Sequence, residues 1–163
     1  MRGNQTQWYI GTPNGVVLCI DARHGDMYKG HFYHAYDKEG TALSTIEDMV
    51  FALERFYDSI NFPHPTTNDR TFKETVAAPQ RRQERKRVMT DEELLKRHGD
   101  LGTFIIRVQH RQNSSWQGRV TWMEEDKTVR FRSIFEMIKL IESALDTVGV
   151  EEENTLEISW DED

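Results

Sequence analysis

Arginines are the side chains of this chain whose spacing most clearly indicates chemistry. Between residues 104 and 132 they alternate with apolar residues, which would turn their guanidinium groups to one face of a β-sheet. These arginines are Arg107, Arg111, Arg119, Arg130 and Arg132. A guanidinium pairs in a planar geometry with carboxylate or phosphate. The pattern therefore predicts a basic face for a protein partner or for nucleic acid, unless the chain's own acidic residues or solvent alone cover it.

A second basic stretch lies in the middle of the chain. It spans residues 81–87 and contains Arg81, Arg82, Arg85, Lys86 and Arg87. Such runs bind phosphates without sequence preference because they release counterions, but they are also common on solvated helix faces. We interpret this stretch as a second candidate surface for a partner or for nucleic acid.

The other reactive side chains do not form a recognisable catalytic or metal site. His31 and His34 are three residues apart on an expected strand, so they would point to opposite faces. His24 and Asp26 supply too few ligands for zinc, and Cys19 has no cysteine partner. The sequence therefore predicts no catalytic residue, no metal and no cofactor. An enzyme built around His24, His31 and Asp26 is the least favoured hypothesis.

Composition narrows the class of protein. The chain has 163 residues, a net charge of -7 and 37% apolar residues, which suits one domain or two very small ones. A single cysteine, a polar start and no long apolar run predict a cytoplasmic protein without a signal peptide or membrane span. The last 18 residues carry eight acids and neither Lys nor Arg. This acidic tail would either keep the protein soluble or cover the arginines.

An internal repeat organises the sequence. A shift of 88 residues aligns residues 16–60 with residues 104–148 without a gap, and six of the 45 aligned positions are identical. The identical pairs are Arg23 and Arg111, Gly30 and Gly118, Ile46 and Ile134, Met49 and Met137, Glu54 and Glu142, and Asp58 and Asp146. Repetition of this kind predicts two similar structural units. Two unrelated stretches of similar length remain the alternative.

Each unit is expected to contain strands followed by a helix. In the second unit, alternation predicts strands near 104–109, 116–122 and 129–132. Apolar residues at spacings of three and four after Ser133 predict a helix that ends at Gly149. In the first unit, matching strands precede a helix that is capped by Ser44 or Thr45 and ends near Phe62.

These elements predict an α+β fold. We expect a two-layer sandwich in which two βββα repeats form a mostly antiparallel sheet, with both long helices on one face and the other face open. Residues 1–62 would form the first repeat, and residues 63–100 a basic linker with a short helix that starts with a capping box at Thr90. Residues 101–163 would form the second repeat with its acidic end. Residues 7–10 and 156–160 are candidate extra strands.

One resemblance covers about the last third of the chain. Residues 104–118, which read FIIRVQHRQNSSWQG, are followed by Phe131-Arg132-Ser133 and by residues 138–145, which read IKLIESAL. This pattern resembles small uncharacterised proteins of anaerobic Firmicutes. The resemblance implies a bacterial source, with a mobile-element context, and transfers no activity.

The favoured function is that of a non-catalytic interaction protein. An adaptor, inhibitor or assembly subunit would bind a protein partner, or a second copy of itself, through a sheet face or an edge strand. The alternative is a nucleic-acid-binding module that uses the arginine-rich face and the 81–87 run. Nucleic-acid binding would fall steeply with salt.

Overall fold

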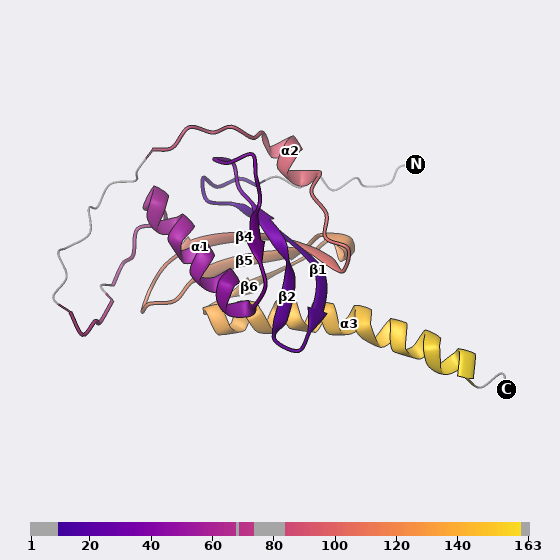
Figure 1. Ribbon diagram of the computed structural model, residues 1–163. Coiled ribbons are helices and arrows are strands. Elements are labelled where there is room, and N and C mark those ends of the chain that lie inside the picture. The colour runs from indigo at the N-terminus through magenta and orange to yellow at the C-terminus, as the bar shows by residue number, and fades with distance from the viewer. Residues whose placement is uncertain (1–9, 68, 74–83, 161–163) are drawn as a thin grey trace.

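The computed structural model describes residues 10–67, 69–73 and 84–160, the last part from residue 149 onward by its backbone alone. Within these residues the fold is α+β, with one six-stranded sheet and three α-helices (Figure 1). The strands are β1 (Val16–His24), β2 (Met27–Tyr33), β3 (Thr41–Leu43), β4 (Gly102–His110), β5 (Gln117–Trp122) and β6 (Lys127–Phe131). The helices are α1 (Ile46–Ile60), α2 (Asp91–Leu95) and α3 (Ile134–Trp160), and a short 3-10 turn, Met123–Glu125, joins β5 to β6.

The sheet has its two longest strands at its centre. Its order is β3-β2-β1-β4-β5-β6, and every neighbouring pair is antiparallel. Val17 of β1 lies opposite Ile105 of β4. On each side of this central pair the strands follow one another in chain order, so short turns suffice to connect them. The predicted α+β class and antiparallel sheet are confirmed.

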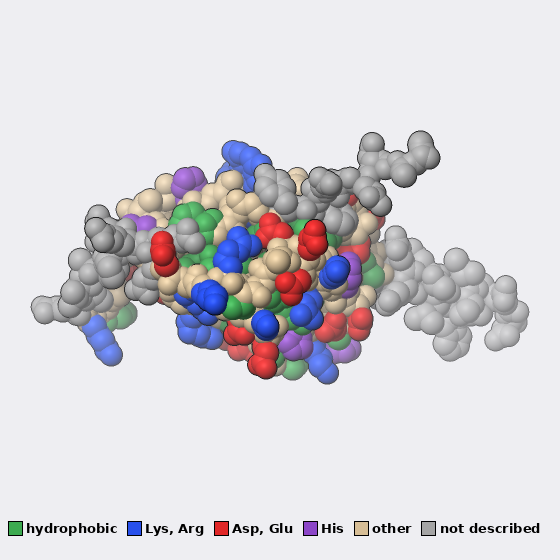
Figure 2. Space-filling view, turned by 90° about the horizontal axis from the view of Figure 1, so that it is seen from above, with side chains coloured by type: hydrophobic (Ala, Val, Ile, Leu, Met, Phe, Trp, Pro, Cys, Tyr) green, Lys and Arg blue, Asp and Glu red, His purple; other side chains and the backbone are tan. Residues whose placement is uncertain are grey.

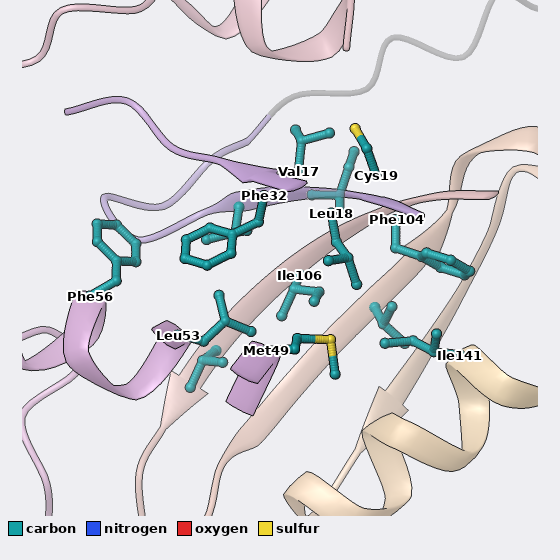
Figure 3. Close-up of a cluster of buried hydrophobic side chains, with 14 of the residues drawn as sticks. Val17, Leu18, Cys19, Phe32, Met49, Leu53, Phe56, Phe104, Ile106 and Ile141 are labelled. Carbon is teal, nitrogen blue, oxygen red and sulfur yellow. The ribbon is translucent and has the colours of Figure 1, made fainter. Parts of the chain in front are cut away.

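One face of the sheet packs against the two long helices. Leu18 and Ile106, from the two central strands, point toward Met49 and Leu53 of α1 and toward Ile141 of α3 (Figure 3). All five side chains are fully buried. Helix α1 begins where the sequence places a cap, because the Thr45 hydroxyl accepts a hydrogen bond from the backbone N–H of Asp48.

The opposite face of the sheet centre is also covered, which corrects the expectation of an open face. Val17 and Cys19 point away from the long helices (Figure 3) and are buried. Helix α2 lies on this side (Figure 1), with Leu94 completely buried. The Arg97 guanidinium lies 4.7 Å from the ring centroid of Tyr33. The segment that was expected to be a linker therefore packs as a cover. The face of the molecule seen from above carries basic and acidic side chains interspersed (Figure 2).

The cover is held by its own local structure and by hydrogen bonds to the central strands. Thr90 and Glu93 form the predicted capping box at the start of α2. Beyond α2, the backbone N–H of Gly99 donates to the Thr103 hydroxyl at 2.9 Å, and the N–H of Asp100 donates to an Asp21 carboxylate oxygen at 3.0 Å. These bonds fix the end of the segment on β1 and β4.

The last described residues of the chain, up to Trp160, form a helix rather than a strand. Helix α3 continues through Gly149 to Trp160 and projects beyond the sheet (Figure 1). The prediction of a strand at 156–160 is therefore wrong. A lone glycine costs a helix only about 1 kcal/mol, and the glutamates that follow it favour helix. Of the other candidate strand, residues 7–9 lie outside the described residues.

Both central strands contain a β-bulge. The register of β1 against β2 shifts between Ile20 and Ala22, and the register of β4 against β5 shifts between Val108 and His110. A bulge inserts one extra residue, so side chains beyond it change faces relative to simple alternation. The residues at the ends of β1 and β4 are therefore turned toward the long helices.

A glycine accompanies each bulge because the backbones approach too closely for any side chain. A Cβ on Gly118 would lie 2.1 Å from the carbonyl oxygen of Arg107, and a Cβ on Gly30 would lie 1.9 Å from that of Cys19. Both distances are far below a van der Waals contact. The mid-strand glycines that the sequence singled out are thus explained by packing.

A methyl group added at Gly118 should strongly destabilise the protein. We expect Gly118→Ala to lower the free energy of unfolding by about 3 kcal/mol, since backbone must move to admit the Cβ. Gly25→Ala is the control, because a Cβ there meets no atom within 4 Å and the cost is only that of its positive φ. Urea denaturation measures both, and equal losses would contradict the explanation.

A buried histidine packs against α1 next to β2. The rings of His34 and Phe56 are stacked, with centroids 4.0 Å apart and planes at 9°. The backbone N–H of Tyr36 donates to His34 Nδ1 at 3.1 Å. Burial, assisted by the charge of Arg85 and opposed by that of Asp37, lowers the pKa of His34 to about 4. The ring is therefore neutral at pH 7.

This histidine gives the fold an acid sensitivity. The unfolded chain protonates His34 at its ordinary pKa of 6.5, whereas the folded chain resists protonation until about pH 4. The free energy of unfolding should therefore fall by about 3 kcal/mol as the pH drops through this window. Urea titrations at several pH values should show a shallower fall in His34→Gln. His24→Gln, at an exposed turn, should keep the wild-type slope; identical slopes in all three proteins would contradict the assignment.

Candidate binding surface

Three arginines lie in one row across β4, β5 and β6. Arg107 is paired in register with Arg119, and Arg119 with Arg130. Residues opposite one another on neighbouring strands share a face, and like charges in that position are destabilising. Alternation in the sequence predicted this row, which we call the arginine row (Arg107, Arg119 and Arg130).

Hydroxyl groups hold Arg107, the member of the arginine row nearest the sheet centre. Arg107 is half-buried, and its Nη2 donates to the Thr121 hydroxyl at 3.0 Å. Thr121 is itself buried and lies 2.8 Å, oxygen to oxygen, from the Thr128 hydroxyl. These contacts hold the Arg107 guanidinium flat against the sheet, so that it forms part of a fixed surface.

The outer end of the row is open to solvent. Arg119 and Arg130 are exposed, and neither forms an ion pair or a side-chain hydrogen bond within the described part of the chain. Five donors on each guanidinium are thus available to an outside acceptor. Chemically, the arrangement suits a carboxylate or phosphate that bridges adjacent strands.

Arg111 does not belong to this surface, and the expectation that it would be exposed is wrong. Only 3% of its surface is accessible. Its Nη1 binds Glu54 Oε1 at 2.6 Å and Asp58 Oδ1 at 2.7 Å, and its Nε donates to the carbonyl oxygen of Pro63 at 2.7 Å. The β4 bulge explains the difference, since it turns Arg111 to the face occupied by α1.

Glu54 extends this network to a buried tryptophan. Its Oε2 accepts a hydrogen bond from the indole N–H of Trp116 at 3.1 Å, while its Oε1 binds Arg111. A single carboxylate on α1 thus satisfies two side chains of the β4–β5 hairpin. The Trp116 ring also packs edge-on against Tyr57, at 5.3 Å between centroids.

A related ion pair links β1 to α3. Arg23 binds Asp146 of α3, and the Tyr28 hydroxyl lies beside Arg23 and Glu142. Burial raises the pKa of Tyr28 to about 12, and the charge of Glu142 adds to the effect. This pair is more open to solvent than the Arg111 network, with 22% of the Arg23 side chain exposed.

The other predicted basic residues are scattered. Arg132 is exposed and held by Glu136 four residues later, with Nη2 2.8 Å from Oε2. Arg85 donates to the Ser59 hydroxyl at 3.0 Å, and Arg87 pairs with Asp91 at 2.8 Å. Lys86 is exposed as well. Arg81 and Arg82 lie outside the described residues, so the 81–87 run is seen only in part.

Metal and catalytic chemistry gain no support from the described residues. Among them no group of three or more His, Cys, Asp or Glu side chains is arranged to hold a metal ion. Cys19 is buried, and burial together with the nearby Asp21 raises its pKa to about 12, so it is a protonated thiol. His24 and His31 border a shallow depression of about 500 Å³ that Asp26 does not line.

The sequence analysis missed an apolar groove between β6 and α3. The groove has a volume of about 260 Å³ and runs along the edge strand. Its lining includes Trp122 and Val129 from the sheet and Leu140 and Ala144 from α3. Nearly half of the Val129 surface is exposed. The available signal was Ala144, a small residue at a position where the aligned first unit has Phe56.

Comparison with protein-family models, curated proteins and solved structures finds no match to this chain. The resemblance of residues 104–145 to Firmicutes proteins therefore stays a prediction. No helix in the described part of the chain has the length and apolar character that crossing a membrane requires.

The two arginine pairs provide a matched test of burial. We expect Arg111→Ala to lower the free energy of unfolding by about 3 kcal/mol, because it removes three hydrogen bonds of a buried side chain and leaves the carbonyl oxygen of Pro63 without its donor. Arg23→Ala should cost only about 1 kcal/mol, since 22% of the Arg23 side chain is exposed, against 3% for Arg111, and solvent screens its ion pair with Asp146. Urea denaturation compares the two, and equal losses would show that burial of the Arg111 network contributes nothing.

Proposed function

We propose that this protein is a non-catalytic interaction protein that binds an acidic segment of a protein partner at β4, β5 and β6. An adaptor, an inhibitor or an assembly subunit would act in this way. The observation that carries the proposal is the arginine row, which ends at an open sheet edge. The partner would lie over the row and along β6.

The arginine row favours an anionic partner on electrostatic grounds. Three guanidinium groups in register repel one another, and a carboxylate between them relieves that repulsion. Because Arg107 is fixed on Thr121, part of the geometry exists before binding and less conformational entropy is lost. The strands β1, β2 and β3 have no such row, because the corresponding cross-strand positions are occupied by Cys19, His31 and Ala42.

The edge strand favours a partner in an extended conformation. β6 ends the sheet, and four of its five residues are exposed. Such an edge offers backbone donors and acceptors to an added strand. Lys127 and Arg130 lie on this edge and discourage pairing with a second β6, because like charges would gather there. A strand that carries acids meets no such obstacle.

We also infer that the sheet consists of two βββα halves related by an approximate two-fold axis. The 88-residue shift in the sequence equals the separation of Val17 and Ile105, which pair at the sheet centre. The same shift relates the two bulges, the glycines that accompany them and the first residues of α1 and α3. These coincidences support duplication over chance similarity.

The ion pairs support the same inference. Arg111 binds Asp58 of α1, and Arg23 binds Asp146 of α3. Both members of the second pair are related to those of the first by 88 residues. Each arginine thus contacts the helix of the other half, so the two halves would fold as one unit rather than as separate domains.

A nucleic acid is the second candidate partner, because a phosphate backbone would also satisfy the arginine row. Lys86, in the described part of the 81–87 basic run, is exposed and offers a further positive charge to a phosphate. Against it, the face of the arginine row presents no Phe, Tyr or Trp ring on β4, β5 or β6 on which a base would stack, and His110 at the end of β4 is the one ring on these strands that shares the face. We therefore place nucleic acid second.

The test is capture of partners from lysate of the source cells by the purified protein, with and without nuclease. We expect a protein band that survives nuclease, is lost with Arg119→Glu and is retained with Arg55→Glu. Arg55 is an exposed arginine on α1 and provides the matched charge reversal. Loss of all captured material on nuclease treatment would favour nucleic acid. Unchanged capture by Arg119→Glu would exclude the arginine row from both functions.

A further inference from the structure

We propose that the groove between β6 and α3 binds a single aromatic side chain of an acidic, extended peptide that adds as a strand to β6. This inference rests on the proposed function and on the proposed arrangement of two halves. It specifies the chemistry of the partner segment that the proposed function requires. It concerns the helix-side face of the sheet, whereas the arginine row lies on the other face.

The groove is apolar and of limited size. Phe104, Val120, Trp122 and Val129 form its sheet side, and Leu140 and Ala144 are among the residues of its helix side. Its volume of about 260 Å³ lies just below the roughly 300–1,000 Å³ of pockets that hold drug-sized molecules. One ring on a side chain suits this space better than a whole small molecule.

The first half of the chain shows what fills the corresponding place. Phe56 is the eleventh residue of α1, and Ala144 is the eleventh residue of α3. In the first half the Phe56 ring stacks on His34 at 4.0 Å. In the second half Trp122 occupies the position of His34 in the 88-residue alignment, and both Trp122 and Ala144 line the groove. The groove therefore lies at the position where the first half has the Phe56 ring and the second half has only Ala144.

The edge strand provides the route by which a ring would reach the groove. Lys127 and Val129 of β6 line the groove, and the intervening Thr128 and Arg130 lie on the face of the arginine row. A peptide paired with β6 would likewise point alternate side chains to the two faces. Its aromatic residue would enter the groove, and the acids on either side of that residue would face Arg130 and Arg119.

The opposite edge of the sheet, formed by β3, lacks these features. β3 has three residues against five in β6, and in the first half the Phe56 ring, stacked on His34, fills the place that corresponds to the groove. Lys127 borders the groove of β6 and adds a positive charge there. Length, space and charge thus all favour the β6 edge, and a peptide with acids on both sides of an aromatic residue complements it.

The first experiment varies the peptide and leaves the protein unchanged. The probe is a synthetic peptide, acetyl-Glu-Val-Glu-Phe-Glu-Val-Glu-amide, titrated into the full chain by isothermal calorimetry. Replacing its Phe by Ala should weaken binding on the order of tenfold, because the ring loses its apolar burial. Replacing its glutamates by lysines should abolish binding. Equal affinities of the Phe and Ala peptides, including no binding of either, would overturn the proposal.

The second experiment fills the groove from within. Ala144→Phe places on α3 the ring that α1 carries at Phe56, so it should weaken binding of the Phe peptide on the order of tenfold and bring it near the affinity of the Ala peptide. Arg55→Glu is the control and should bind as the wild type does. Circular dichroism should show an unchanged or higher thermal midpoint for Ala144→Phe.

The outcomes separate this inference from the proposed function. If Ala144→Phe stays folded and binds the Phe peptide as tightly as the wild type, the groove does not hold the ring, and the inference is wrong. Should that variant fail to fold, the comparison of the Phe and Ala peptides decides alone. The proposed function is tested independently, because it fails if Arg119→Glu leaves partner capture unchanged or if nuclease removes all captured material.

Discussion

The buried guanidinium of Arg111 is the interaction on which the arrangement of this molecule depends. It joins the end of β4 to two carboxylates of α1, and one of these, Glu54, also receives the indole N–H of Trp116. A charge with only 3% of its residue exposed must be compensated, or burial would cost several kcal/mol. The angle and height of α1 on the sheet are therefore set by this network as well as by apolar packing. Apolar contacts alone tolerate sliding, whereas three directional hydrogen bonds from one guanidinium to Glu54, Asp58 and the Pro63 carbonyl do not.

The bulge that turns Arg111 inward also determines what remains on the other face. Without the extra residue at the end of β4, Arg111 would lie on the same face of the sheet as Arg107, Arg119 and Arg130. With it, the arginine row contains three arginines and ends at the open edge. The bulge thus gives Arg111 a structural role on the helix side and leaves the arginine row on the other face. Gly118 makes the irregularity possible, since any side chain there would strike the β4 backbone.

Much of the fold follows from local signals in the sequence, and the departures arise from contacts between distant segments. The helix over residues 46–60 and its Thr45 cap are readable because spacing and capping are properties of neighbouring residues. The bulge beside Val108 is not, because it is a mismatch between two strands and leaves each strand's own pattern intact. The sequence predicts a linker where the segment around α2 covers the sheet, because charged residues surround its buried side chains, Met89 and Leu94. In the candidate surface, alternation identified Arg119, whereas the groove required knowledge of which helix faces which strand.

The differences between the two halves that we propose are the most informative feature for function. Positions that the proposed duplication keeps identical serve packing and ion pairing, as in the pair Asp58 and Asp146. Positions that differ separate the two edges: a ring at Phe56 closes one side, and Ala144 leaves the other open. Stability alone would favour a ring in both places, because an unfilled apolar space costs free energy. Retaining the gap beside an open edge strand and a row of arginines is consistent with a surface that is completed by another molecule. On this view the first half stabilises the sheet, and the second half uses the same framework for binding.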